Sequence, residues 1–169
     1  MADIIYQIPG YEKGRVQHVR ASDREGVSLI VAQMVADLRR KWGTSVLCIS
    51  LDGQKETIEA LIPQEEGLAR AYVIDQKNPD CDIIVRKAAG IINRRFVRAV
   101  IVSGAGRLKI DGGTSGDTSA ALSGLQRLAQ NKDIPVILVS LGDPGTENPS
   151  RIGVKIQSFE NQSINRYSP

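Results

Sequence analysis

The sequence has few of the features that mark membrane-spanning, secreted or metal-binding proteins. Its apolar runs, such as residues 99–106 and 135–142, are far too short to cross a bilayer, and residues 1–10 lack the basic start and long apolar stretch of a signal peptide. The two cysteines, Cys48 and Cys81, lack metal-ligand spacing and lie in or next to apolar segments, so we expect buried free thiols. These absences predict a cytoplasmic protein without a membrane span, a disulfide or a metal site.

Aromatic residues and histidine are also scarce, which limits the chemistry that the chain can offer. Aromatic side chains make up 4% of the 169 residues, so platforms on which single-stranded bases stack are few. His18, the one histidine, lies inside an apolar segment, where we expect a hydrogen-bonded core or edge residue rather than a catalytic base. The formal charge of +3 permits contact with nucleic acid, and phosphates would then dominate that contact.

The chain does have a regular alternation of apolar strands and helices. Runs typical of buried strands occupy residues 15–21, 45–52, 69–75, 98–103 and 134–143. Helices are predicted over residues 27–42, 53–62, 84–96 and 121–129, because apolar residues recur three and four positions apart in the longer ones. Residues 151–169 alternate weakly, which predicts an edge strand or hairpin before a loose end.

This order of elements indicates the fold class. Nearly continuous apolar strands leave no side for water, so they predict a mainly parallel sheet with helices on both faces. The predicted fold is α/β: a single three-layer domain over residues 1–158 with a five- or six-stranded sheet, followed by a loose C-terminal tail at 159–169. In such a sheet, ligands bind the loops at the carboxyl ends of the strands. These loops are therefore where function is sought.

The first of these loops has the pattern of a phosphate-binding loop without its lysine. Ala21 stands at the first glycine of the pattern GxxxxGK[ST], and Gly26 matches the second. Ser28 keeps the hydroxyl that would hold Mg²⁺, but Val27 replaces the lysine that would neutralise the β and γ phosphates. The pattern thus predicts the shape of a nucleotide site without its charge.

The remaining residues of this loop weaken its charge balance further. Asp23 and Glu25 place two negative charges close to where a triphosphate would lie, and Arg24 is one cation against them. Taken alone, the segment also fits a strand-to-helix turn in which Ser22 or Asp23 caps the helix. The loop by itself does not decide between these two interpretations.

Over nearly its whole length, the chain resembles the RecA-like ATPase core of DnaB-type replicative helicases. The segment SVLCISLDGQKETIEALI is similar to a family strand that ends in a catalytic glutamate, and Asp52 stands at that place. The strand RAVIVS is similar to the one that closes with the Mg²⁺-orienting aspartate, where this chain has Ser103. The strand IPVILVSLGD is similar to the one whose last polar residue senses the γ-phosphate, where this chain has Leu141.

The resemblance therefore implies a RecA-like domain whose catalytic groups have been replaced. Losing the phosphate cation, the metal ligand and the sensor together removes most of the electrostatic stabilisation that phosphoryl transfer requires. We expect no catalytic residue and no cofactor, with ATP and Mg²⁺ binding left open. The residues assigned to the vestigial nucleotide site are Ala21, Ser22, Asp23, Arg24, Glu25, Gly26, Ser28 and Asp52.

The same resemblance implies contact with single-stranded nucleic acid. In RecA-like motors the loop after the fourth strand faces the nucleic acid, and the matching loop here is rich in glycine and carries Arg107 and Lys109. Arg94, Arg95 and Arg98 are expected to extend a basic surface, although basic residues at a helix end also complement the helix dipole. The implied partners are single-stranded nucleic acid or an active helicase, in a homo-oligomer that acts in replication, recombination or packaging.

Other functions stay open at this stage. RecA-like domains pack side by side, so a protein-interaction module or inhibitor without nucleic-acid binding is the first alternative. A weak nucleotide-binding ATPase is the second. Several aspartates fall in loops at the carboxyl ends of strands, where paired carboxylates serve as acid and base or bind Mg²⁺, but their spacing matches no known motif.

Overall fold

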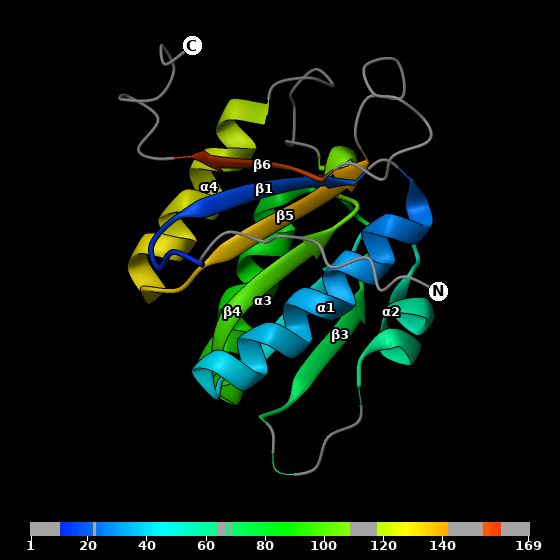
Figure 1. Ribbon diagram of the computed structural model, residues 1–169. Helices are drawn as coiled ribbons and strands as arrows, with labels where there is room; N and C mark the ends of the chain where they lie inside the picture. The colour runs from blue at the N-terminus through cyan, green and yellow to red at the C-terminus, as the bar shows by residue number, and fades with distance from the viewer. Residues whose placement is uncertain are drawn as a thin grey trace.

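Six strands form one sheet in the order β3-β2-β4-β5-β1-β6 (Figure 1). The computed structural model describes residues 11–21, 23–63, 67, 69–108, 118–141 and 154–159. The strands are β1 (Val16–Ala21), β2 (Ser45–Ser50), β3 (Ala71–Asp75), β4 (Val97–Ser103), β5 (Val136–Leu141) and β6 (Val154–Phe159). β1 to β5 run parallel, and β6 pairs antiparallel with β1 at the end of the row.

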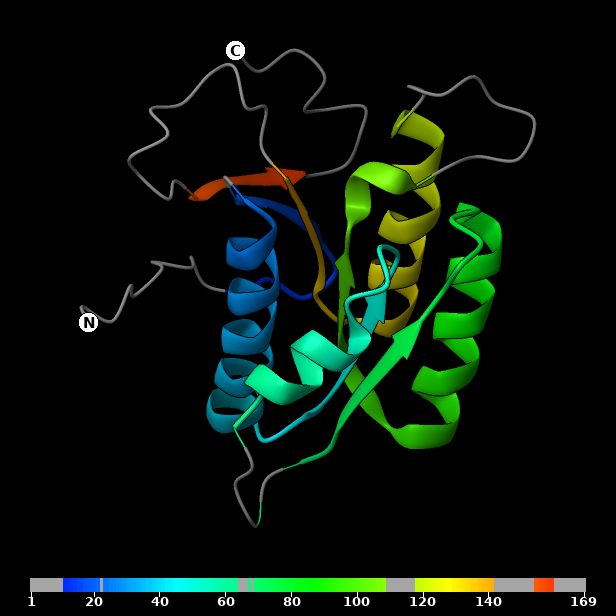
Figure 2. The same ribbon diagram turned by 90° about the vertical axis from the view of Figure 1, so that its right-hand side faces the viewer.

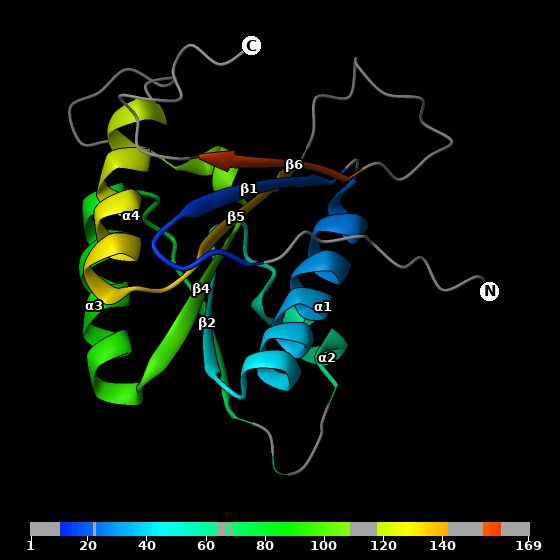
Figure 3. The ribbon, with the colours of Figure 1, turned by 60° about the vertical axis from the view of Figure 1, so that its left-hand side comes forward.

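The helices cover both faces of this sheet. They are α1 (Arg24–Trp42), α2 (Lys55–Leu61), α3 (Cys81–Arg95) and α4 (Thr118–Lys132), with a short 3₁₀ turn, η1 (Ala105–Arg107), after β4. Figure 3 shows α1 and α2 on one face, and α3 and α4 on the other. The described residues therefore form one three-layer α/β unit with a RecA-like arrangement, and the predicted fold class is confirmed. The predicted tail lies outside the described residues apart from Phe159.

The core consists of two apolar layers, one on each side of the sheet. In β4, Ala99 and Ile101 belong to the layer under α1, whereas Val100 and Val102 belong to the layer under α3 and α4. Both faces of the strand are thus buried, which is why its sequence is continuously apolar instead of alternating. Burying one valine or isoleucine side chain contributes about 1.5–3 kcal/mol, so these two layers provide most of the drive to fold.

The ends of α1 show how local sequence fixes the elements. Asp23 is the N-cap, and Gly43 ends the helix in the left-handed region at φ 61°, where a residue with a Cβ is strained. Three basic residues occupy the last turn, where they complement the partial negative charge of the helix end. Among the described residues, no helix combines the length and apolar character required to span a membrane.

The parallel topology gives the sheet two chemically different edges. Each parallel strand ends at what we call the carboxyl edge, and begins at the opposite amino edge. Figure 2 shows the long helices running along the strands, α1 on one face and α3 beside α4 on the other, each starting at the carboxyl edge and ending at the amino edge. Connections that enter helices therefore gather at one edge, and connections that leave helices gather at the other.

Candidate functional site

The turn from β1 to α1 is shorter than the phosphate-loop pattern requires. β1 ends at Ala21 and α1 begins at Arg24, so Gly26 is already inside the helix. The Gly26 N–H donates to Oδ1 of Asp23 at 2.6 Å, so the carboxylate of the N-cap residue takes a first-turn amide. A phosphate loop uses such amides to hold its ligand. The segment is thus built as a capped strand-to-helix turn, as in the second interpretation of the sequence.

The side chains after this cap are divided between core and solvent. Val27, at the position of the missing lysine, is 2% exposed and packs in the apolar layer under α1. Ser28 is 1% exposed, and its hydroxyl has no hydrogen-bond partner among the described residues. Arg24 and Glu25 are exposed, and Ser22 lies outside the described residues. The hydroxyl of Ser28, which the sequence assigned to the vestigial site, thus faces the protein interior.

A row of polar residues ends three neighbouring strands at the carboxyl edge. Ser50 of β2 is in register with Ser103 of β4 on one side and with Asp75 of β3 on the other. Ser103 is fully buried, and its hydroxyl also lacks a hydrogen-bond partner within the described part of the chain. The position that would carry a metal-orienting aspartate therefore holds a neutral hydroxyl in a closed environment.

Asp52 follows this row and is held in place by its neighbours. The Ser50 hydroxyl donates to Oδ1 of Asp52 at 3.0 Å and accepts from the Gln54 N–H at 2.9 Å. A Cβ added to Gly104 would lie 3.0 Å from Cγ of Asp52, and Gly104 has a φ of 76°. The loops after β2 and β4 thus meet at Asp52.

The electrostatics of this edge are acidic around the polar row. Burial raises the pKa of the Cys48 thiol, and the negative charges of Asp52 and Asp75 raise it further. Both carboxylates therefore lie near the end of β2, where their oxygens are of the kind that Mg²⁺ prefers. Within the described residues, no group of three or more histidine, cysteine, aspartate or glutamate side chains is arranged to hold a metal. Leu141, at the sensor position, is half exposed.

A side-chain hydrogen bond that the sequence did not reveal joins His18 of β1 and Ser140 of β5. Nε2 of His18 lies 2.6 Å from Oγ of Ser140, and the expectation of a hydrogen-bonded core or edge histidine is confirmed. Burial lowers the pKa of His18 to about 4, with a further lowering from the positive charge of Arg20. A Ser–His pair serves acyl transfer only where the hydroxyl reaches a substrate, and Ser140 is 6% exposed. His18 and Ser140 are 122 positions apart, so no local sequence motif indicates that they pair.

The structure separates the basic residues that the sequence grouped together. Arg107 lies in η1 at the carboxyl edge, whereas Arg94 and Arg95 end α3 and Arg98 begins β4 at the amino edge. β4 is 7 residues long, and a strand rises about 3.3 Å per residue, so roughly 20 Å of sheet separates the two groups. Lys109 lies outside the described residues.

The three amino-edge arginines differ in their surroundings. Nε of Arg94 donates to the Gly90 carbonyl at 3.2 Å, and the Arg95 guanidinium lies over the Tyr72 ring, 5.9 Å from its centre. The Arg98 side chain makes no hydrogen bond or ion pair with another described residue, and it lines a cavity of about 450 Å³. Among the predicted contact residues, Arg98 thus lines a cavity.

No protein-family model and no curated protein matches this chain. Its fold and candidate sites are therefore described from its own residues.

Proposed function

We propose that this chain is a non-catalytic RecA-like module that acts by binding nucleic acid. The observation that carries the proposal is the turn at the start of α1, where Asp23 already places a carboxylate on the amide of Gly26. A triphosphate at this turn would meet that negative charge and would find no lysine, because Val27 is packed in the core. The turn is suited to stabilising the helix rather than to holding ATP.

The rest of the carboxyl edge supports the same proposal. Phosphoryl transfer needs preorganised positive charge or metal at the transferred group. Ser103 and Leu141 replace two of the groups that supply or sense that charge, and Asp52 is engaged by Ser50. The α/β fold is thus combined with a carboxyl edge that lacks the groups that stabilise the transition state of phosphoryl transfer.

Nucleic acid is the ligand class that the charges favour. The formal charge is +3, and exposed arginines lie at both edges of the sheet. A module of this kind would serve replication, recombination or packaging, beside an active helicase or as a homo-oligomer, as the family resemblance implies.

A direct test is equilibrium binding of fluorescein-labelled oligothymidylate and oligouridylate by anisotropy over a range of salt concentrations. We expect binding at low salt that weakens steeply as salt rises, because phosphate contacts release counterions. Absence of binding to both oligonucleotides at low salt would refute the proposal.

The second candidate is a protein-interaction module without nucleic-acid binding. A groove of about 330 Å³ lies between α1 and α2. Leu29 and Leu61 line it, and they are 39% and 42% exposed. Exposed leucines beside a groove are typical of a surface that another protein covers. Concentration-dependent sedimentation of the wild type against a Leu29→Glu/Leu61→Glu variant tests whether this surface mediates self-association, and identical profiles would leave it without that role.

A further inference from the structure

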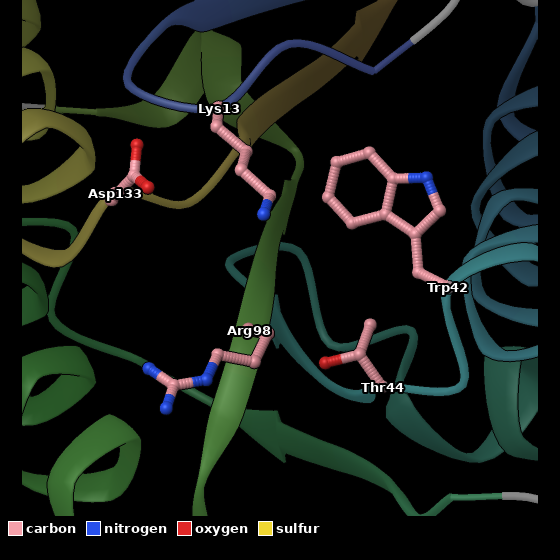
Figure 4. Close-up of a pocket in the computed structure, with 5 residues that line it drawn as sticks. All are labelled: Lys13, Trp42, Thr44, Arg98 and Asp133. Atoms are coloured by element: carbon pink, nitrogen blue, oxygen red, sulfur yellow. The ribbon is translucent and has the colours of Figure 1, made fainter.

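The amino edge of the sheet contains a cavity that neither the phosphate-loop pattern nor the family resemblance assigns. Its volume is about 450 Å³, within the range of small-ligand sites. Figure 4 shows Lys13 reaching down between Asp133 and Trp42, with Arg98 and Thr44 on the opposite side of the cavity. Its lining residues come from the segment before β1, the junction of α1 and β2, the start of β4 and the α4–β5 connection: Lys13, Trp42, Thr44, Arg98 and Asp133.

The walls of this cavity are held by contacts far apart in the sequence. Gly14, next to Lys13, donates its N–H to the Ile134 carbonyl at 3.0 Å, and its own carbonyl accepts from Nε2 of Gln126 at 3.0 Å. The Trp42 indole packs edge-on against Tyr11, with ring centres 6.1 Å apart. The backbone that carries the cavity is thus preorganised, which reduces the entropy lost on binding.

The pairing of β2 with β4 is interrupted at Arg98. Ser45 pairs with Val97, but Val46 pairs with Ala99, so Arg98 has no residue opposite it in β2. An extra residue of this kind re-aims a side chain and is common beside binding sites. Arg98 is the one exposed residue of an otherwise buried strand. The irregularity therefore turns a cation out of the sheet and into the cavity.

The groups that line the cavity suit a phosphodiester. The Lys13 ammonium and the Arg98 guanidinium supply positive charge and hydrogen-bond donors. The Lys13 ammonium lies 5.7 Å from the centre of the Trp42 ring, so cation and aromatic wall face the same space. Asp133 is the one anion of the lining.

Basic residues extend from this cavity along the whole edge. Among the described residues, the basic side chains at the amino edge are Lys13, Arg15, Arg39, Arg40, Lys41, Arg70, Arg94, Arg95, Arg98 and Lys132. Those at the ends of α1, α3 and α4 are explained by the helix dipoles. Lys13 and Arg98 are not in helices, so the dipoles do not account for the two cations that line the cavity.

Phe96 adds an exposed aromatic ring to the same edge. It ends α3 in the left-handed region at φ 54° and is 75% exposed. An aromatic residue is strained in this conformation, and glycine is the usual residue at such a helix end. Neither packing nor backbone preference explains a phenylalanine here, whereas contact with an unpaired base does.

We infer that the amino-edge cavity binds single-stranded nucleic acid, with a backbone phosphate between Lys13 and Arg98 and a base against Trp42. The inference rests on the proposed function and adds its location and chemistry. A single strand is favoured over a duplex because only unpaired bases can enter a cavity and pack on an aromatic side chain. A polymer is favoured over a free nucleotide because Arg94 and Arg95 continue the row of cations beyond the cavity.

Two variants of matched charge test this placement by anisotropy with labelled oligothymidylate. The cavity variant is Lys13→Ala/Arg98→Ala, and the control is Lys77→Ala/Arg86→Ala, which removes two exposed cations from the β3–α3 connection and from α3. We expect the cavity variant to weaken binding roughly tenfold or more, and to reduce the salt slope by about 0.7, because the two side chains share one single-strand phosphate and each such contact contributes about 0.7. The control should change affinity by less than about threefold.

Intrinsic fluorescence provides a second measurement, because Trp42 is the only tryptophan of the chain. Saturating oligothymidylate should quench its emission in the wild type. Binding without quenching would refute the contact between a base and Trp42. Loss of binding in the control variant alone would show that the cavity is not the binding site, while leaving the proposed function intact. Equal affinity for thymidine monophosphate and for oligothymidylate would refute the preference for a polymer. If the wild type binds no oligonucleotide, the proposed function itself fails.

Discussion

Val27 shows how much and how little a single residue reveals in the sequence. Its identity alone indicates that the phosphate-loop lysine is missing. Its spacing from Ile30 and Val31, three and four positions further on, predicts that it lies on the apolar face of the helix. Asp23 starts α1 early enough to place Val27 in the apolar layer. The missing charge and the burial of Val27 could therefore both be predicted, whereas the choice between a phosphate loop and a capped turn could not.

Restoring the lysine should harm the protein instead of activating it. Val27→Lys places an ammonium where the native side chain is 2% exposed, so we expect the free energy of unfolding to fall by about 3 kcal/mol or more. Urea unfolding measures this loss. The control is Leu29→Lys on the same helix, at a side chain 39% exposed, for which a change within about 0.5 kcal/mol is expected. A Val27→Lys protein of native stability that binds ATP would contradict this account of the turn.

His18 should make stability depend on pH in a defined window. Its pKa falls from an ordinary 6.5 to about 4 on folding, so below pH 6.5 the unfolded chain takes up a proton that the folded protein does not. Stability is then full above this pH and is lost as the pH falls towards 4, by about 2 kcal/mol after allowance for solvent around the half-buried ring.

The His18→Gln variant isolates this contribution from that of the carboxylates. The stability difference between wild type and variant, measured by urea unfolding at several pH values, should shift in favour of the variant as the pH falls from 7 to 4. A difference that stays constant over this range would show that His18 titrates alike in both states.

At the scale of elements, periodicity predicted the strands and helices well. The five parallel strands and the three longer helices occur because each has a strong apolar pattern, and the short helix α2 and the edge strand β6 occur where the sequence has weaker patterns. The boundary of α1 was harder to predict, since residues 22–28 fit both a phosphate loop and a capped turn. The choice depends on one hydrogen bond, from the Gly26 N–H to Asp23, which composition and spacing do not encode.

Gly104 is the element-scale position most sensitive to substitution. Gly104→Ala would place a Cβ 3.0 Å from Cγ of Asp52 at a φ of 76°, so we expect unfolding free energy to fall by about 1–3 kcal/mol. Gly106→Ala is the matched control, because a Cβ there meets nothing within 4 Å. Thermal denaturation of both variants measures the effect, and equal melting temperatures would argue against the tight contact between the loops after β2 and β4.

At the scale of the whole molecule, the two edges of the sheet have different characters. The carboxyl edge, where ligands of such folds bind, carries the acidic pair Asp52 and Asp75 beside two buried serines. The amino edge carries the cavity that Lys13, Trp42 and Arg98 line. These three residues are distant in the chain, and only the topology brings them together. The sequence therefore predicted basic contacts by residue type, but could not predict that Lys13, Trp42 and Arg98 line one cavity.

The most direct test of the central claim is thermal unfolding of the wild type with and without saturating ATP and Mg²⁺. A ligand at a hundred times its dissociation constant stabilises the folded state by about 2.7 kcal/mol, which corresponds to roughly 5–10 °C for a chain of this size. The account predicts no change in melting temperature, because Asp23 occupies the amide at the start of α1 and no lysine offsets its charge. A rise of several degrees that disappears in Ser28→Ala would contradict it.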